Sequence, residues 1–367
     1  MGIYVVPVLL TMWALLSGFR GSIRADHLTV AGCAIVAAAI CGFRWNSDAD
    51  FGGYFQIYSD TAFLSGFTSA SIASIYGEPG YLFLVSVFKS LGAGFGPFVL
   101  ACSVCSIGLK SAVVTKLSRQ ASLALCLYLC LQFVTTEFIQ MRWALATAFL
   151  SLAFCLQYLK RYRLAVLAYF VAAGFHYFAS FFWILAILTT MKGHRRFYVI
   201  FGISILGSFF IRAEHLSGFL PTDSEIYALQ RLTRYAADPA SHIGVISLAK
   251  LLMYPLIYSA CVHLRPNYPW KADRLNQFLF KLSLILLSGT VLMTVVPVFH
   301  ARATVLVDFF AIIWILNAMH VALSVGTRTV AFTALAILYC AWYVIDVSNN
   351  RNAMQLSDYH TWLIASR

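Results

Sequence analysis

Two arginines, each near the start of an apolar segment, could together bind one anion. Arg142 lies at the start of the apolar segment 140–158, and Arg302 directly precedes the apolar segment 303–323. A guanidinium fork matches the oxygens of a phosphate and stays charged at any pH that a cell experiences. Two such forks at one depth, on helices that face each other, predict a site for a diphosphate. For either arginine alone, snorkelling into lipid headgroups is the open alternative.

Glu78 and His176 are the candidate proton acceptors. Glu78 begins the string Glu-Pro-Gly-Tyr, and His176 lies between Phe175 and Tyr177 within an apolar segment. A carboxylate or an imidazole within hydrogen-bond reach can take the proton of an attacking hydroxyl, and Glu78 is the first choice for this base. Two alternatives stay open. Glu78 could only stabilise the N-terminus of a helix, and His176 could be a packed histidine with one satisfied nitrogen.

A second set of polar residues could hold the substrate. Asp48 and Asp50 precede Tyr54, and acids with tyrosines suit hydrogen bonds to sugar hydroxyls, although a hydrated loop explains each acid equally well. Arg231 and Arg234 have helical spacing and could meet a second phosphate or pair with a nearby acid. The predicted substrate-binding residues are Asp48, Asp50, Tyr54, Tyr81, Arg231, Arg234 and His300.

No set of metal ligands is evident in the sequence. Asp48 and Asp50 have the Asp-X-Asp spacing of a metal motif, but the pair of arginines already supplies the positive charge that a metal would bring. The 9 cysteines lie in or beside apolar segments, and no histidine or carboxylate completes a ligand set with them. We therefore expect catalysis without a divalent ion and without a cofactor.

The composition indicates what kind of fold must position these residues. Of the 367 residues, 61% are hydrophobic and 11% are charged, which is too little charge to cover a soluble globule of this size. Unbroken apolar runs such as 164–175 and 331–344 are typical of membrane helices and not of the alternating strands of a barrel. The sequence predicts an all-α polytopic membrane protein, one domain over 1–367, with about 11 to 12 transmembrane segments.

Basic and acidic residues fall into alternate gaps between the apolar segments. The basic clusters belong in the cytoplasm under the positive-inside rule. They contain Arg20 and Arg24, Lys116 and Arg119, Lys160 to Arg163, Lys192 to Arg196, Arg265 to Arg274, and Arg328. The other gaps are then outside, and two of them, 45–79 and 213–242, are long. Loops of this kind with aromatic and charged residues often handle substrate, and the candidate residues above gather on this outer side.

Two apolar segments are too irregular to be single straight spans. Segment 164–190 has basic clusters at both ends, so it must enter and return, which predicts a hairpin of short helices with His176 at its tip. Segment 80–115 is interrupted by glycines and Pro97, which predicts a short re-entrant or interfacial helix over 80–91 and a true span from Pro97. Irregular backbone at membrane depth needs protein or a water-filled cavity around it, so both places favour a cavity.

Taken in order along the chain, these features resemble a known family. They are the acids and tyrosines of the first long outer loop, Glu78 with its Glu-Pro-Gly-Tyr string, Arg142 followed by Leu145 and Ala146, Phe175 with His176, and Arg302 before a late span. Over residues 45–310 this pattern is similar to that of the EpsG-like branch of Wzy-type O-antigen and polysaccharide polymerases. The chain departs from the family pattern at Trp143, where the family often has glutamine, and at Phe178, where it often has a small hydroxyl residue.

The resemblance implies a GT-C-like glycosyltransferase in the inner membrane of a bacterium, with its active site facing the periplasm. Such an enzyme transfers a growing glycan from undecaprenyl diphosphate to the non-reducing-end sugar of another lipid-linked repeat unit, as in lipopolysaccharide or exopolysaccharide biosynthesis. Under this interpretation Arg142 and Arg302 stabilise the diphosphate leaving group, and Glu78 or His176 is the base. Membrane lipids are further partners, and a chain-length regulator is a family expectation.

Other functions remain open on the sequence alone. An O-antigen ligase-type transferase would need the same arginines but a different acceptor. A lipid-linked oligosaccharide flippase or transporter would carry charges through the depth of the bundle, whereas here Asp308 and Lys250 are the exceptions to an outward bias of polar residues. The formal net charge of +12 favours contact with anionic lipids and not with nucleic acid, because the basic residues are scattered through cytoplasmic loops.

Overall fold

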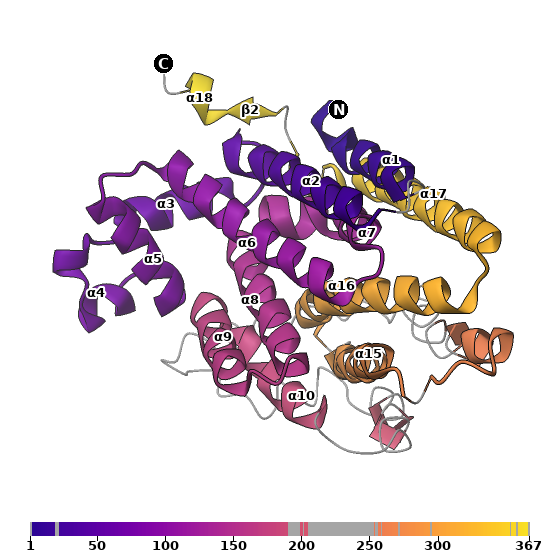
Figure 1. Ribbon diagram of the computed structural model, residues 1–367. Coiled ribbons are helices and arrows are strands. Elements are labelled where there is room, and N and C mark those ends of the chain that lie inside the picture. The colour runs from indigo at the N-terminus through magenta and orange to yellow at the C-terminus, as the bar shows by residue number, and fades with distance from the viewer. Residues whose placement is uncertain are drawn as a thin grey trace. The chain divides into compact units, whose positions relative to one another are not determined.

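The computed structural model describes most of the chain. The described residues are 2–18, 22–189, 199–200, 202–204, 253, 256–257, 259–270, 272–293, 296–352, 354–356 and 359–365. Helices account for nearly all of the secondary structure in these ranges, which confirms the predicted all-α class (Figure 1). The chain forms two compact units, one of Met1–Ser180 with Val325–Arg367 and one of Phe181–Ser324. The single membrane domain over 1–367 stays a prediction.

Six helices among the described residues are long and apolar enough to cross a membrane. They are α2 (Ile23–Phe43), α6 (Phe95–Leu117), α7 (Ala121–Gln132) continuing into η3 (Phe133–Ile139), α15 (Arg274–Leu292), α16 (Pro297–Ala322) and α17 (Val325–Asn350). Shorter apolar helices include α1 (Val6–Gly18) and α9 (Tyr162–Phe175). The protein is therefore a multi-pass membrane protein. The total of about 11 to 12 segments includes ranges outside the described residues and stays a prediction.

The first unit is a bundle in which α6 is central. Helix α6 packs against α2 on one side and against α8 (Met141–Tyr158) on the other, and α8 in turn packs against α9 (Figure 1). Helices α1, α2 and α17 pack against α7. The Asp26 carboxylate, at the start of α2, accepts hydrogen bonds from the backbone N–H groups of Ala121 and Ser122 at 2.9 and 3.1 Å. It therefore satisfies donors at the start of α7 that the helix itself cannot.

The predicted interruption of segment 80–115 is confirmed as a break between two helices. Helix α5 spans Pro79–Ser90 and α6 begins at Phe95. Between them Gly92 has a φ of +73°, the left-handed conformation that favours glycine at the end of a helix. The Ala93 N–H then donates to the Phe88 carbonyl at 3.0 Å, which closes the end of α5. Whether α5 is re-entrant or interfacial stays a prediction, since both terms refer to a membrane.

The predicted outer loop 45–79 is folded and not a loose connection. It contains α3 (Phe51–Asp60), η2 (Leu64–Gly66) and α4 (Ser69–Ala73). The Lys89 ammonium of α5 donates to the carbonyls of Ser59 and Thr61 at 2.9 and 2.5 Å, so it satisfies the C-terminal end of α3. Aromatic rings of Trp45, Phe51, Phe55, Tyr58, Phe95 and Phe98 pack between this loop and the start of α6.

A short strand pair joins the loop to the C-terminal part of the chain. Strand β1 (Arg44–Trp45) pairs antiparallel with β2 (His360–Thr361), which is followed by α18 (Trp362–Ala365). The Tyr359 hydroxyl donates to the Ile40 carbonyl at 3.0 Å. The end of α2, where loop 45–79 begins, is therefore fixed from two directions.

The helix of segment 164–190 is interrupted at the histidine, as the sequence predicts. Helix α9 ends at Phe175, His176 has extended backbone with φ −157° and ψ 120°, and η4 follows over Tyr177–Ser180. Helix α10 (Phe181–Thr189) belongs to the second unit. The return of this segment as a hairpin therefore stays a prediction.

The second unit contains α10, α15 and α16, with α15 packed against both others. The Asp273 carboxylate caps α15 by accepting from the Asn276 N–H at 3.0 Å. The other long outer loop, 213–242, lies outside the described residues together with Arg231 and Arg234.

Candidate active site

An ion pair between Arg142 and Glu78 forms the centre of the candidate site. The Arg142 Nη1 donates to Glu78 Oε2 at 2.6 Å, although the two residues are far apart in the sequence. Glu78 as a whole residue is 6% exposed, and the Arg142 side chain is 13% exposed. A charge this far from water needs a partner of opposite sign. The pair that the sequence predicts as base and phosphate ligand is thus assembled in one place.

Tyrosines surround the guanidinium group of Arg142. Its Nη2 donates to the Tyr76 hydroxyl at 3.1 Å, and its Cζ lies 4.8 Å from the centre of the Tyr76 ring. The rings of Tyr54 and Tyr81 have their centres 5.7 and 5.9 Å from the same Cζ. Aromatic faces attract a cation at these distances, and the rings exclude water from it. The tyrosines therefore hold the guanidinium in one orientation.

Two buried polar atoms of this cluster lack a partner. Arg142 Nε and the Tyr81 hydroxyl are both buried, and neither has a hydrogen bond within the described part of the chain. A buried donor without an acceptor is costly, by about 1–3 kcal/mol for a neutral group and more for a charged one. Buried donors without a partner are rare in folded proteins, so Arg142 Nε and the Tyr81 hydroxyl call for an explanation, and anion binding by Arg142 stays a prediction.

The position of Glu78 follows from the proline after it. Pro79 occupies the first turn of α5, where its missing N–H costs nothing, and Glu78 is the residue that precedes the helix with φ −76° and ψ 144°. The Glu78 side chain makes no hydrogen bond to the end of the helix. Its carboxylate is directed to Arg142 and so does more than stabilise the N-terminus of α5.

His176 lies on the other side of the Glu78 carboxylate. Its Nδ1 is 3.9 Å from Glu78 Oε1, which is too far for a hydrogen bond, and it accepts from the Phe178 N–H at 3.2 Å. In the neutral imidazole the proton is therefore on Nε2. The Trp143 ring meets the imidazole edge to face with ring centres 5.1 Å apart. Trp143 and Phe178, where the chain departs from the family pattern, thus both contact this histidine.

A pair of glycines allows the two broken helices to approach. A methyl group built on Gly80 would lie 2.7 Å from the Gly174 carbonyl oxygen, closer than any side chain tolerates. Because this neighbour is backbone, it cannot move aside alone. Gly80 is two residues from Glu78 and Gly174 is two residues from His176, so the contact between α5 and α9 sets the distance between carboxylate and imidazole.

A second buried ion pair supports the start of α8. Lys110 of α6 donates to Glu137 Oε1 at 2.5 Å, and each side chain is 1% exposed. The same carboxylate accepts from Ser106 Oγ at 2.8 Å and from the Tyr128 hydroxyl at 2.7 Å. Lys110 also donates to the Ala144 carbonyl at 3.0 Å, two residues beyond Arg142. The sequence places Glu137 near Arg142, but the structure gives it this different partner.

Lys110 and Tyr76 are residues that sequence reasoning missed. Lys110 is a charge within a predicted span, so it joins Asp308 and Lys250 as an exception to the outward bias of polar residues. A lone lysine inside an apolar segment was a usable signal, since such residues pair or serve a function. Tyr76 lies two residues before the Glu-Pro-Gly-Tyr string, but nothing in the sequence distinguishes it from the other tyrosines of loop 45–79.

Asp48 is buried in the turn that leads from α2 to α3. Its Oδ2 accepts from Arg44 Nε at 2.9 Å, and its Oδ1 accepts from the Asp50 N–H at 3.1 Å. Burial raises the pKa of the Asp48 carboxyl, and the charge of Arg44 acts against that rise. Asp50 is exposed at the start of α3. The two acids therefore differ in burial, and their role as sugar ligands stays a prediction.

Tyr54 and Tyr81 differ from these acids because both contact the central pair. The Tyr54 hydroxyl accepts from the Arg142 N–H at 3.5 Å, and burial raises the pKa of its phenol. The ring centres of Tyr54 and Tyr81 are 6.0 Å apart. The structure thus brings Glu78, Arg142, His176, Tyr54 and Tyr81 together.

Arg302 and His300 lie at the start of α16 in the second unit. His300 Nδ1 is 3.1 Å from the Thr290 carbonyl oxygen, Arg302 is half-buried, and Asp308 further along α16 is buried. Arg142 belongs to the first unit and Arg302 to the second. The joint diphosphate site of the two arginines therefore stays a prediction, as does substrate binding by His300.

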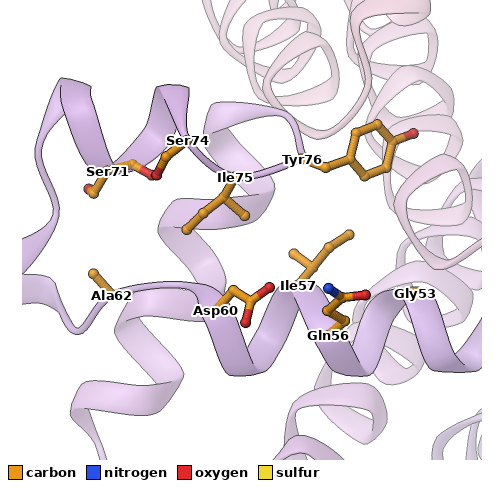
Figure 2. Close-up of a pocket in the computed structure, with 9 residues that line it drawn as sticks. All are labelled: Gly53, Gln56, Ile57, Asp60, Ala62, Ser71, Ser74, Ile75 and Tyr76. Carbon is orange, nitrogen blue, oxygen red and sulfur yellow. The ribbon is translucent and has the colours of Figure 1, made fainter.

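An open pocket of about 590 Å³ lies beside the arginine site. Figure 2 shows its walls: α3 lies along one side, and the residues of α4 and of the turn after it face α3. Tyr76 is part of the lining, and it is also the tyrosine that accepts from Arg142. Within the described residues, no group of three or more histidines, cysteines and acids is arranged to hold a metal ion.

Fold and site together define a multi-pass α-helical membrane protein with a desolvated arginine and carboxylate pair next to a polar pocket. A family model described as the EpsG family matches residues 32–361, so the chain belongs to the EpsG family. This membership confirms the resemblance seen in the sequence and indicates a polysaccharide polymerase-like membrane protein of the glycosyltransferase kind. No curated protein and no solved structure gives a significant match to this sequence.

Proposed function

We propose that this protein polymerises polysaccharide repeat units carried on undecaprenyl diphosphate. The single observation that carries the proposal is the convergence of Arg142, Glu78 and His176 from three separate segments of the first unit. It supplies a cation for a diphosphate and a base for a hydroxyl within one desolvated cluster. Family membership supports the same reaction class.

The reaction joins two lipid-linked oligosaccharides. A hydroxyl oxygen of the acceptor's non-reducing-end sugar attacks the anomeric carbon of the donor glycan and forms the new glycosidic bond. The bond between that carbon and the diphosphate oxygen breaks, and its electron pair stays on the leaving group. The hydroxyl proton passes to the Glu78 carboxylate. The products are a longer lipid-linked glycan and undecaprenyl diphosphate.

Arg142 stabilises the charge that develops on the leaving group. Its Nε–H has no partner in the described part of the chain, and its two terminal nitrogens are held by Glu78 and Tyr76. A fixed donor in a poorly hydrated site stabilises a growing anion without reorganisation, and removing one such donor typically lowers kcat by about 10²–10³. In this proposal Arg302 adds a second fork to the same diphosphate, with His300 beside it.

His176 is the second candidate for the base that takes the proton of the acceptor hydroxyl. Its position 3.9 Å from Glu78 Oε1 allows the ring to receive the proton after small movements of either side chain. Tyr54 and Tyr81 orient Arg142, while Asp48, Asp50 and the arginines 231 and 234 are assigned to substrate binding from the sequence alone.

We further propose that the reaction needs no divalent ion and takes place on the periplasmic side of the bacterial inner membrane. The arginines supply the positive charge that a metal would otherwise provide. Membrane lipids and, as in related systems, a chain-length regulator are the expected partners. Polymerisation that stops when a chelator is added, and returns with Mg²⁺, would contradict the metal-independent part of the proposal.

The test is to incubate the purified protein with a defined undecaprenyl-diphosphate-linked repeat unit and to size the products on a gel. The proposal predicts a ladder of glycans that differ by one repeat unit. Unchanged substrate from folded, membrane-reconstituted protein would contradict it. A deletion strain separates the alternatives, since loss of a polymerase leaves single units on the final acceptor, loss of a ligase leaves none, and loss of a flippase strands units in the cytoplasm.

A further inference from the structure

One wall of the pocket in Figure 2 is formed by residues on a single side of helix α3. Gln56 and Ile57 follow Gly53 by three and four residues, and Asp60 follows them by four and three, so the four residues lie on one side of the helix. The Gln56 amide and the Asp60 carboxylate are exposed, and neither makes a hydrogen bond within the described residues. The Asp60 carboxylate offers hydrogen-bond acceptors, and the Gln56 amide offers both a donor group and an acceptor.

The facing wall adds hydroxyl groups and apolar surface. Ser71 Oγ donates to the Thr68 carbonyl at 2.8 Å, and Ser74 Oγ donates to the Ser71 carbonyl at 3.0 Å. These bonds fix the two hydroxyls, and the Ser74 oxygen still has lone pairs that can accept. Ile57, Ile75 and the Tyr76 ring complete the lining with carbon surface.

This lining selects one class of ligand. A saccharide presents hydroxyls at its edge and C–H groups on its faces, which match carboxylate, amide and hydroxyl groups set among isoleucine and tyrosine. Among the described residues that line the pocket, Asp60 alone is charged, and its negative charge disfavours a phosphate there. The volume of about 590 Å³ is within the range of about 300–1,000 Å³ that small-molecule sites have.

We infer that this pocket is the subsite for the acceptor's terminal sugars, an inference that rests on the proposed function. Contacts of Arg142 give the direction, because Tyr76 lines the pocket and its hydroxyl accepts from Arg142, which also donates to Glu78. A sugar that occupies the pocket and contacts Tyr76 has its end beside the proposed base. Gln56 and Asp60 bind its hydroxyls and thereby select which repeat unit can be extended.

Two neighbouring glycines provide a matched test. A methyl group built on Gly53 or on Gly52 meets nothing within 4 Å, so a side chain can begin at either position without a clash at its Cβ. Gly53 lines the pocket and Gly52 does not. The variant Gly53→Leu therefore adds an isobutyl group to the lining of the pocket, while Gly52→Leu makes the same change to helix propensity and surface outside it.

The probe is the lipid-free repeat-unit oligosaccharide, released by mild acid from the host strain's own lipid-linked units and titrated into the reconstituted protein by ligand-observed NMR. We expect Gly53→Leu to raise the Kd at least tenfold and Gly52→Leu to change it less than twofold. Gln56→Ala, a truncation of an exposed side chain, is expected to raise the Kd as well, and it serves if Gly53→Leu lowers the thermal stability.

Two outcomes would overturn the inference: no binding of the oligosaccharide to the wild-type protein, or equal binding to the wild type and to Gly53→Leu or Gln56→Ala in their folded forms. The binding measurement is independent of turnover. A wild-type protein that binds the oligosaccharide in this pocket but forms no ladder would therefore contradict the proposed function and leave the sugar site standing. A wild-type protein that forms a ladder but does not bind the oligosaccharide would contradict the sugar site and leave the proposed function standing.

Discussion

Arg142 is held by contacts of three chemical kinds, and each restricts it differently. The Glu78 carboxylate at 2.6 Å neutralises its charge, the Tyr76 hydroxyl at 3.1 Å fixes the plane of the fork, and the tyrosine rings exclude water. None of these contacts occupies Nε. The Nε–H is therefore the donor that the proposed function assigns to the diphosphate leaving group.

At the residue scale we predict that Glu78→Gln lowers the rate of chain growth by about 100-fold or more. Glutamine keeps the size and can still accept a hydrogen bond from Arg142, but it cannot take the acceptor's proton. The measurement is the initial rate of ladder formation by purified protein, with Ser59→Ala on the exposed surface of α3 as the control. A wild-type rate for Glu78→Gln would show that another group is the base.

The candidate residues could be predicted from sequence where a short local pattern marks them. Glu78 stands in a four-residue string, Arg142 begins an apolar segment, and His176 interrupts one. No such pattern marks Tyr76, because its importance comes only from the contact with Arg142. The pairing of Asp48 with Arg44 could not be predicted either, because it depends on a turn whose shape the sequence does not reveal.

At the scale of elements, helix breaks bring the site together. Helix α5 begins at Pro79 and α9 ends at Phe175, so the backbone is irregular where Glu78 and His176 lie. The sequence indicated both breaks, because proline, glycine and histidine interrupt apolar runs there. The close approach of Gly80 to Gly174 could not be predicted, since a glycine in sequence does not identify the backbone that it faces.

This approach predicts that Gly80→Ala disrupts the site. The added methyl group would meet the Gly174 carbonyl at 2.7 Å, so α5 and α9 must separate and the Glu78 to His176 distance must grow. We expect a lower Tm and at least a tenfold loss of chain growth. Gly108→Ala is the matched control, because a methyl group there meets nothing within 4 Å. Wild-type Tm and activity in Gly80→Ala would mean that the contact is not a constraint.

The π-helix η3 is the element that holds the second ion pair. Glu137 lies in η3, and its partner Lys110 reaches both this carboxylate and the Ala144 carbonyl of α8. Irregular helical turns of this type are frequent at functional sites. The network therefore joins α6, η3 and α8, and its contact with α8 at Ala144 lies two residues beyond Arg142.

We predict that Lys110→Met destabilises the protein by about 3–5 kcal/mol, because Glu137 would remain buried without a cation. The double variant Lys110→Met/Glu137→Gln should recover much of that loss, since neither charge is then left unpaired. Chemical unfolding in detergent micelles measures both. If the single variant is as stable as the wild type, the two groups do not form a buried ion pair in the membrane.

At the scale of the whole molecule, the composition and the alternation of charges predicted the class of fold. The six long apolar helices of the described residues agree with it, and so does the family match over residues 32–361. The folding of loop 45–79 into α3, η2 and α4 was less predictable, because its aromatic residues find their partners in α6, far along the chain. Sequence patterns identify membrane-spanning helices more readily than they identify how the loops between those helices fold and pack.

The charge alternation also predicts which loops lie outside the cytoplasm. A reporter enzyme that is active only outside the cytoplasm, fused after Ser65 in loop 45–79, should be active, whereas the same reporter fused after Arg119 should be inactive. Short basic loops are retained in the cytoplasm, and the loop between α6 and α7 is of this kind. The reverse pattern of activities would place the Arg142 site on the cytoplasmic side.

The most direct test of the central claim is the ladder assay with Arg142 variants. Purified wild-type protein, Arg142→Ala and Arg142→Lys are each reconstituted, checked for equal folding, and given the same lipid-linked repeat unit. We predict a ladder for the wild type, none for alanine, and at most a hundredth of the wild-type rate for lysine, because an ammonium cannot form the guanidinium fork. Full-length ladders from Arg142→Ala at the wild-type rate would contradict the assignment of this arginine to the leaving group.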